Sequence, residues 1–521
     1  MKHIGKSAFL FSLGTFFSRV SGMAREMAMA FVLGTTPAAA AFLIAFRFAY
    51  LLRRLFGESA LVNGFIPHYQ AMRTKDEKGA ANFFGDLFAT MSVLLIGLIG
   101  ILELFLLLSL QFLPIHESNA EILRLIMLSL PGLLFICLFA LHCGFLQCHG
   151  RFFLTGIAPI AFNIAWIGTL ILYRHQPPSS ITSHLAIALD VAFLFQWAVL
   201  LPATWKKLKG FLTTWRFKLF SSEIRAMLAA IALSIVGVGA MQVNGFIDTL
   251  FARAADLAGP AYLAYAMRLE QFPLALFGIA ISSALFPSLS KAIGNGEEST
   301  SQNLLEFGIL RTSFLMIPCT VGILLLGAPA INLLFGHGQF TDVSTIKTTI
   351  CLWAYGLGLL PTALALLFSQ AFFARRDFKT PMILSCCAIL LNIAFNSFMI
   401  FGLQLGATSV ALSTSVAAFV NASVLHFLYR KRFSFPKIQW QAIFRILAST
   451  ASGAMACLAV SFWLGDHSLF AILQGGIPVF EHSLLKQALI LGLPGIAFVS
   501  AFVVTGYFVR CQETLSFLRV K

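Results

Sequence analysis

The stretch Ser18-Arg19-Val20-Ser21-Gly22-Met23-Ala24-Arg25-Glu26 places two arginines inside an apolar run that extends from about Ala8 to Leu33. A third, Arg47, lies in the next apolar run. Each charge near the centre of a bilayer costs roughly 2.5–3.5 kcal/mol on insertion scales, and Glu26 offsets part of that cost for Arg25. Arginines kept at this cost indicate a membrane-embedded site for something negatively charged.

Composition identifies the class of protein. The 521 residues are 59% hydrophobic and 11% charged, with a mean hydropathy of +0.87, whereas a soluble chain carries about twice that charge. The apolar runs do not alternate as barrel strands do. The net charge of +15 lies mostly in short loops, where it sets topology, so no nucleic-acid partner is expected. The nine cysteines show neither metal-ligand nor disulfide spacing.

The sequence predicts an all-α polytopic membrane protein with about 14 transmembrane helices. The expected spans are 8–33, 38–56, 81–112, 122–147, 153–173, 181–204, 224–251, 261–289, 303–335, 346–373, 379–402, 407–429, 440–464 and 485–509.

The loops between these spans alternate between basic and nearly uncharged. The loop 206–218 carries five lysines and arginines, whereas the loop before it carries Arg174 alone. Because basic loops stay on the cytoplasmic side, both termini are expected in the cytoplasm. Arg19 and Arg25 interrupt what would be the core of a signal peptide, so the first helix is expected to be retained.

An internal repeat is visible in two motifs. Arg47 precedes Leu55-Phe56-Gly57 by the same spacing that separates Arg268 from Leu276-Phe277-Gly278. A second pair starts at Arg151 and Arg376, each followed by Phe and Thr at equal spacing. The offsets, 268 − 47 = 221 and 376 − 151 = 225, are nearly equal. An offset that covers six spans predicts a parallel duplication about an axis along the membrane normal.

The duplication sets the expected domain organisation. Residues 1–205 form a first six-helix lobe and 219–435 a second, around a central cavity. Residues 436–521 add two further helices that are expected to form a lipid groove. Prolines and glycines inside the spans predict kinks beside that cavity.

Several motifs, in order, resemble the MurJ (MviN) family. They are Ser18 to Glu26, Ala41-Phe42 to Arg47, Leu51 to Glu58, Phe65-Ile66-Pro67, Gln242-Val243-Asn244 with Asp248, Tyr265 to Leu269, Phe286 to Ser290, Leu334 to Phe340, and Phe373 to Pro381 leading to Asn392. The likeness covers nearly the whole chain.

This resemblance implies a lipid II flippase of the multidrug/oligosaccharidyl-lipid/polysaccharide transporter superfamily, and not an enzyme. Such a protein moves undecaprenyl-diphosphate-linked disaccharide-pentapeptide across the bacterial cytoplasmic (inner) membrane for peptidoglycan synthesis. The implied partners are lipid II, membrane lipids and proteins of cell-wall synthesis or division. The family's cavity arginines match Arg19, Arg25, Arg53 and Arg268.

The chain departs from the family pattern at positions that matter for these arginines. The usual acidic residues are replaced by Ala40 and Met267, and Glu270 follows Arg268 at a slightly different spacing. The sequence therefore assigns the arginines no fixed carboxylate partner beyond Glu26.

The arginines differ in the alternative roles that could explain their positions. Arg19 lies about 16 Å into its span at 1.5 Å per residue, too deep for a topology signal. Arg53 binds substrate or anchors the cytoplasmic end of its helix. Arg47 lines the cavity or pairs with Glu58. The cytoplasmic gate is expected near Arg53 and Ser288.

One group of side chains is a candidate cation site. Asp248 and Asp377, with Asn244, offer the carboxylate and amide oxygens that hard cations prefer, so Na⁺ or another coupling ion is an expectation. The simpler alternative for Asp377 is a salt bridge within its loop, beside Arg375 and Arg376. No other cofactor is expected, because no nucleotide-binding loop or catalytic metal motif is present.

Three other functions remain as alternatives. An exporter of another polyprenyl-diphosphate-linked saccharide would need the same arginines. A cation-coupled drug antiporter of the same superfamily would need a carboxylate-rich cavity, and a structural scaffold of the division machinery would need no buried arginine.

Overall fold

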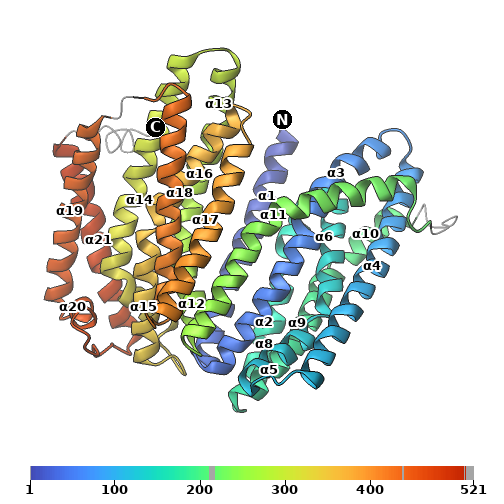
Figure 1. The fold of residues 1–521 in the computed structure, drawn as a ribbon, viewed down its shortest axis with the longest axis horizontal. Helices are drawn as coiled ribbons and strands as arrows, with labels where there is room; N and C mark the ends of the chain where they lie inside the picture. The colour runs from blue at the N-terminus through green and yellow to red at the C-terminus, as the bar shows by residue number, and fades with distance from the viewer. Residues whose placement is uncertain (1, 210–217, 437–438, 510, 512–521) are drawn as a thin grey trace. The chain divides into compact units, whose positions relative to one another are not determined.

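The computed structural model describes residues 2–209, 218–436, 439–509 and 511, and their side chains outside 2–12, 57–63 and 230–241. The described residues are helical and contain no strand (Figure 1). The chain divides into two compact units, Met1–Ile247 and Asp248–Lys521. The boundary falls inside a helix, α11, whereas the sequence placed it in the preceding linker.

The first unit contains α1 (Lys2–Leu33), α2 (Pro37–Arg53), η1 (Arg54–Glu58), α3 (Ser59–Arg73), α4 (Glu77–Phe112), α5 (Glu117–Ser129), α6 (Gly132–Cys148), α7 (Phe152–Ile157), α8 (Pro159–Tyr173), α9 (Pro178–Ala198), α10 (Leu201–Leu208) and most of α11 (Ser222–Ala255). The second contains α12 (Gly259–Pro273), η3 (Leu274–Ile279), α13 (Ala280–Gly294), α14 (Glu298–Phe335), α15 (Asp342–Leu357), α16 (Leu359–Ala374), α17 (Lys379–Ser397), η4 (Phe398–Gly402), α18 (Thr408–Arg432), α19 (Trp440–Trp463), α20 (Ser468–Leu473) and α21 (Leu484–Phe508).

Every expected span contains a helix, and the all-α membrane fold is confirmed. Among the described residues, ten helices are long and apolar enough to cross a membrane, or eleven if the bent pair α5–α6 is one span. The other expected spans correspond to α1, α2 and α11. The count of fourteen stays a prediction.

Two helical stretches extend beyond the spans expected at 38–56 and 261–289. In the first, α2 continues through the π-helical turn η1 into α3, which ends at Arg73. In the second, α12 continues through η3 into α13, which ends at Gly294. Hydropathy predicts only the first half of the α2–η1–α3 stretch, because α3 is more polar, whereas the span expected at 261–289 covers almost all of the α12–η3–α13 stretch.

The span expected at 122–147 is broken. Helices α5 and α6 meet at 44°, where Pro131 cannot donate a ladder hydrogen bond. The N–H of Gly132 instead donates to Asp190 Oδ1 of α9 at 2.7 Å. A side chain from another helix therefore accepts the hydrogen bond of the first N–H group of α6. Inside a membrane such a backbone group needs a partner within the protein.

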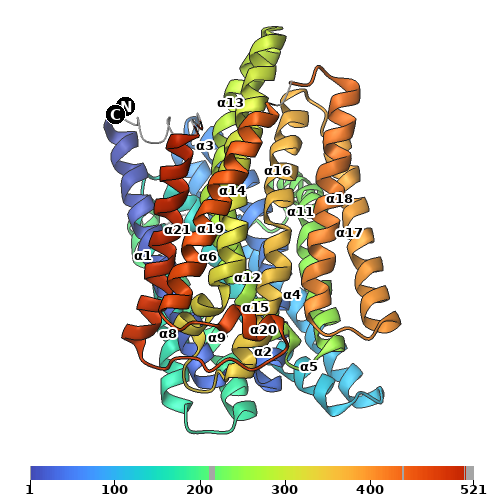
Figure 2. The ribbon, with the colours of Figure 1, turned by 90° about the vertical axis from the view of Figure 1, so that its left-hand side faces the viewer.

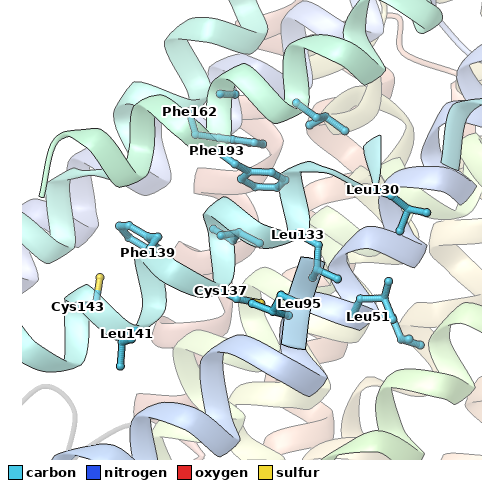
Figure 3. Close-up of a cluster of buried hydrophobic side chains, with 14 of the residues drawn as sticks. Leu51, Leu95, Leu130, Leu133, Cys137, Phe139, Leu141, Cys143, Phe162 and Phe193 are labelled. Carbon is cyan, nitrogen blue, oxygen red and sulfur yellow. The ribbon is translucent and has the colours of Figure 1, made fainter. Parts of the chain in front are cut away.

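The first unit has one large apolar core around α6 and α9. Figure 3 shows Leu133, Cys137 and Phe139 of α6 in this core. Phe162 of α8 and Phe193 of α9 stack with ring centroids 4.9 Å apart. Cys137 and Cys143 are buried in this core, as expected of small core residues.

Helix ends support the internal duplication. Helix α6 is followed by Gly150 at φ +72°, and α16 by Arg376 at φ +60°. The next N–H groups, of Arg151 and Asp377, donate back to carbonyls five residues earlier in each helix. This is the Schellman ending, repeated at an offset of 376 − 150 = 226. Arginine at a left-handed position costs more than glycine, so the second unit keeps this helix ending without a glycine.

The last two long helices pack on the second unit and on each other. Figure 2 shows α19 and α21 side by side, and both contact α14. At their crossing a Cβ on Gly453 would lie 2.8 Å from the carbonyl oxygen of Phe498. Small residues let membrane helices approach this closely.

Replacing Gly453 by valine should therefore force α19 and α21 apart. Overpacking of this kind costs about 1–3 kcal/mol, so we expect earlier thermal unfolding of the purified protein. Gly492→Val in α21 is the matched control, because nothing lies within 4 Å of that added Cβ. Equal unfolding temperatures for the two variants would show that the crossing does not need glycine.

Candidate functional site

Arg25 is held in an aromatic cage within the first unit. Its guanidinium carbon lies 4.7 Å from the ring centroid of Trp166, 5.5 Å from that of Phe162 and 5.9 Å from that of Phe46. Its Nη2 lies 2.6 Å from Glu26 Oε1, and the two side chains are only 13% and 10% exposed. The predicted pairing with Glu26 is thus present, and cation–π contacts with the three rings also offset the cost of burying the charge.

Asn163 of α8 joins this cage to α1. Arg25 Nη1 donates to Asn163 Oδ1 at 3.2 Å, and Asn163 Nδ2 donates to Ser21 Oγ at 2.8 Å. Ser21 in turn donates to the carbonyl of Ser18 at 2.9 Å. The serines of the opening motif therefore fasten α1 to α8 next to the arginine.

Arg19 and Arg25 lie on one uninterrupted helix, α1. Residues six apart on a straight helix differ by about 120° in direction, and the structure shows the consequence: Arg19 is exposed where Arg25 is mostly buried. Arg19 is therefore available to a ligand without rearrangement, whereas Arg25 must exchange its partners.

Arg47 packs against α11 in the first unit. A Cβ on Gly245 would lie 2.5 Å from Arg47 Nη2, so the guanidinium would have to shift if a larger residue replaced this glycine. Arg47 is half-buried. Its expected alternative partner, Glu58, has a side chain outside the described residues.

Arg53 and Arg54 both approach the ring of Tyr50, with guanidinium carbons 5.2 and 5.4 Å from its centroid. Tyr50 replaces an asparagine of the family pattern, so the aromatic ring supplies a contact that the sequence did not predict. The pair stands where α2 passes into the π turn η1.

In the second unit the two expected residues are exposed. Arg268 lies on α12, and Ser288 lies on α13 directly after Pro287. Glu270, two residues after Arg268, is buried. Exposure of Arg268 agrees with a ligand-binding role but does not by itself establish one.

Asp248 is buried between two amides. Asn392 and Asn396 of α17 donate to its Oδ1 at 2.7 and 2.8 Å, and all three side chains are buried. Asn244 lies one turn earlier on α11. Two asparagines four residues apart in an apolar span face one side of a helix, which is the signal that sequence reasoning left unused.

Asp377 and Asp248 do not form one site, because they bind different partners. It accepts from Thr380 N at 3.0 Å and Oγ1 at 2.7 Å, and Arg432 Nη1 lies 3.2 Å from its Oδ2. It precedes α17, whereas Asn392 lies about 20 Å further along that helix at 1.5 Å per residue. The predicted three-residue cation site is therefore wrong.

The expected salt bridge of Asp377 is present, but its partner is Arg432 at the end of α18 and not a residue of its own loop. Arg375 pairs instead with Glu298 at 2.6 Å and donates to Tyr429. Burial raises the pKa of Asp377, but the hydrogen bonds from Thr380 and the charge of Arg432 outweigh it and hold that pKa below its ordinary value. In the described part of the chain, no three His, Cys, Asp or Glu residues gather as metal ligands.

The arginines of the first unit suit a multivalent anion. Guanidinium groups bind phosphate oxygens bidentately, and Arg19 and Arg25 stand on α1, Arg47 and Arg53 on α2, both apolar helices. An all-helical chain with ten or eleven apolar spans and internal arginines defines a polytopic membrane transporter.

Comparison with solved structures identifies proteins with a similar fold. The chain superposes on a lipid II flippase MurJ in an inward closed conformation with a TM-score of 0.73 and 24% identity, covering 96% of this chain and 99% of that one. It also superposes on an inward-facing multidrug resistance MATE family transporter of the MOP superfamily, with a TM-score of 0.63, 16% identity and coverage of 82% and 98%.

Sequence comparison identifies the family. The chain belongs to the lipid II flippase MurJ family, whose sequence model matches residues 29–475. A probable lipid II flippase MurJ of Chlamydia pneumoniae is 30% identical over 87% of this chain and 82% of that protein. The corresponding protein of Rickettsia prowazekii is 26% identical over 96% and 97%.

Proposed function

We propose that this protein moves lipid II, the undecaprenyl-diphosphate-linked peptidoglycan precursor, from the cytoplasmic to the periplasmic leaflet of a bacterial inner membrane. Family membership supports this substrate. The observation that carries the mechanism is Arg25, a largely buried cation in an apolar helix that pairs with its sequence neighbour Glu26. Transport by alternating access requires no catalytic group, and we propose a transporter rather than an enzyme.

Glu26 gives Arg25 a carboxylate partner that a bound diphosphate can replace. A buried arginine stripped of its partner is costly, so Arg25 keeps a carboxylate when no diphosphate is present. On binding, the diphosphate replaces Glu26 as the anion on the guanidinium fork, and the aromatic rings remain. Glu26 then supports the site without touching the substrate, and Arg19, Arg53, Arg47 and Arg268 add positive charge.

Purification with native mass spectrometry tests the substrate directly. Lipid II retained by the wild-type protein supports the proposal. Retention of a different polyprenyl-diphosphate-linked saccharide would favour the main alternative, which needs the same arginines. A cation-coupled drug antiporter would retain neither.

We propose a monovalent coupling cation, with Asp248 as its carboxylate. One carboxylate and the oxygens of Asn392 and Asn396 are ligands of the class that hard cations take, and one negative charge matches one positive charge. No nucleotide-binding motif offers another energy source. The membrane potential contributes about 2.3 kcal/mol per charge for each 100 mV.

The last two helices are proposed to border a groove for the prenyl tail. A shallow pocket between α14, α19 and α20 is lined by apolar side chains, including Leu458, Phe462 and Phe470, and by the polar side chains of Ser461 and Asp466. Phe462 is half exposed there, whereas Phe498 is buried in the α19–α21 crossing. Phe462 is therefore the candidate for tail contact, and Phe498 has a packing role.

The proposed orientation, with both termini in the cytoplasm, predicts a labelling pattern. In a cysteine-free background, Thr74→Cys should react with a membrane-impermeant maleimide only after the cytoplasmic face is opened. Ser179→Cys should react in intact spheroplasts, because its loop carries little positive charge. The reverse pattern would invert the topology.

A further inference from the structure

Two turns of the chain depart from α-helical geometry at equivalent positions of the duplication. They are η1 (Arg54–Glu58) and η3 (Leu274–Ile279), both π-helical. They contain the matching sequences Leu55-Phe56-Gly57 and Leu276-Phe277-Gly278, 221 residues apart. Single π turns are rare and are found frequently at functional sites, so their occurrence in both units calls for a common reason.

Proline is not that reason. Pro273 directly precedes η3 and removes one ladder hydrogen bond, but the equivalent residue before η1 is Leu52 (273 − 221 = 52). A third π turn, η4, ends α17 beside a loop. The first unit has ordinary helix and turn at the matching residues 173–177. Among the described residues, only η1 and η3 are thus shared by the two units.

The packing of the two turns is also equivalent. η1 contacts α6, and η3 contacts α16, the helices that share the Schellman ending. Phe56 packs on the core of the first unit, and Phe277 packs with Met316, Leu359 and Ala363. A Cβ on Gly278 would lie 3.2 Å from that of Ala363. Both turns contact the equivalent helix of their own unit, and η3 also contacts α14, which carries Met316.

Each π turn separates an arginine from a cytoplasmic helix end. Arg47 and Arg268 each precede the glycine of their turn by ten residues, and α3 and α13 follow the turns. A π turn holds one residue more than an α turn needs, so its i→i+5 bonds can shift to i→i+4 bonds without breaking the ladder. Bends in helices concentrate at such turns.

We propose that η1 and η3 are matched hinges, at which the arginine-bearing halves of these two helices change direction against their cytoplasmic halves during transport. The inference rests on the proposed function for its substrate. It assigns the moving parts within each unit to residues 54–58 and 274–279, and it leaves the neighbours α6 and α16 as fixed supports.

Spin labels on either side of η3 test the hinge in the otherwise intact protein. The variants Gln271→Cys and Ser288→Cys replace exposed residues about 25 Å apart along the helix. We expect their distance distribution to shift when lipid II binds. Bound lipid II without any shift would overturn the hinge, whereas no lipid II binding at all would instead count against the proposed function.

Deletion of one residue tests whether the π geometry is needed. Removing Ala275, which is exposed, leaves Leu276-Phe277-Gly278 intact and allows an α-helical ladder. We expect a correctly inserted protein whose transport falls at least tenfold and whose label distance no longer responds. Removal of the exposed Phe401 from η4 is the control and should leave transport within twofold. Wild-type transport without Ala275 would refute the hinge, and the wild-type label distances decide the question if that deletion does not fold.

Discussion

Replacing Arg25 by alanine should lower lipid II affinity at least tenfold and also lower the unfolding temperature. Each lost charge-assisted hydrogen bond costs roughly 1.5–3 kcal/mol, and about 1.4 kcal/mol is tenfold in affinity. The stability loss has a separate cause, because the buried Glu26 is left without its 2.6 Å partner.

The double variant Arg25→Ala/Glu26→Ala separates the two effects. It removes both charges, so we expect unfolding close to the wild-type temperature while binding stays weak. Arg25→Lys should keep the ion pair but lose the planar fork and the stacking on Trp166. Wild-type binding by the double variant would mean that Arg25 serves the fold alone.

Asp248→Ala is expected to have the second large effect. It leaves the amides of Asn392 and Asn396 without the carboxylate that accepts from both. A loss of roughly 1–3 kcal/mol follows from unsatisfied buried polar groups, although hydrogen bonds inside membranes often contribute less. We expect lower thermal stability and strongly reduced transport.

Asp248→Asn then tests the cation. The substitution keeps the shape and removes the charge, so we expect sodium to raise the unfolding temperature of the wild-type protein but not that of the variant. The control is Asp377→Asn, whose carboxylate bonds within its own loop and should leave the sodium response intact. An equal response in Asp248→Asn and wild type would exclude Asp248 as a ligand.

The sequence predicted the fold class well because hydropathy reports burial in lipid directly. It also predicted an internal duplication, which stays a prediction, and the π turns and Schellman endings recur at nearly the offsets of its two motifs. It did not show that α2 continues into α3, since polar helix beyond the bilayer has no hydropathy signal. The bend at Pro131 was expected only as a kink, and its capping by Asp190 depends on a contact across 58 residues.

The sequence predicted the charged residues of the site but not the side chains that contact them. Arg25 and Glu26 are adjacent in sequence, so their pairing was foreseeable. The contacts with Asn163 and Trp166 join residues about 140 positions apart, which local patterns do not reveal. Asp377 was grouped with Asp248 by chemical type alone, and the length of α17 separates them.

The most direct test of the central claim is lipid II binding to purified variants of the three arginines. The set is Arg19→Ala, Arg25→Ala/Glu26→Ala and Arg268→Ala, each beside its Arg→Lys counterpart. Exposure of Arg19 and Arg268 means that their variants should fold normally. If the arginines hold the diphosphate, every alanine variant loses at least tenfold in affinity and lysine restores little of it. Wild-type affinity in all three alanine variants would contradict the account.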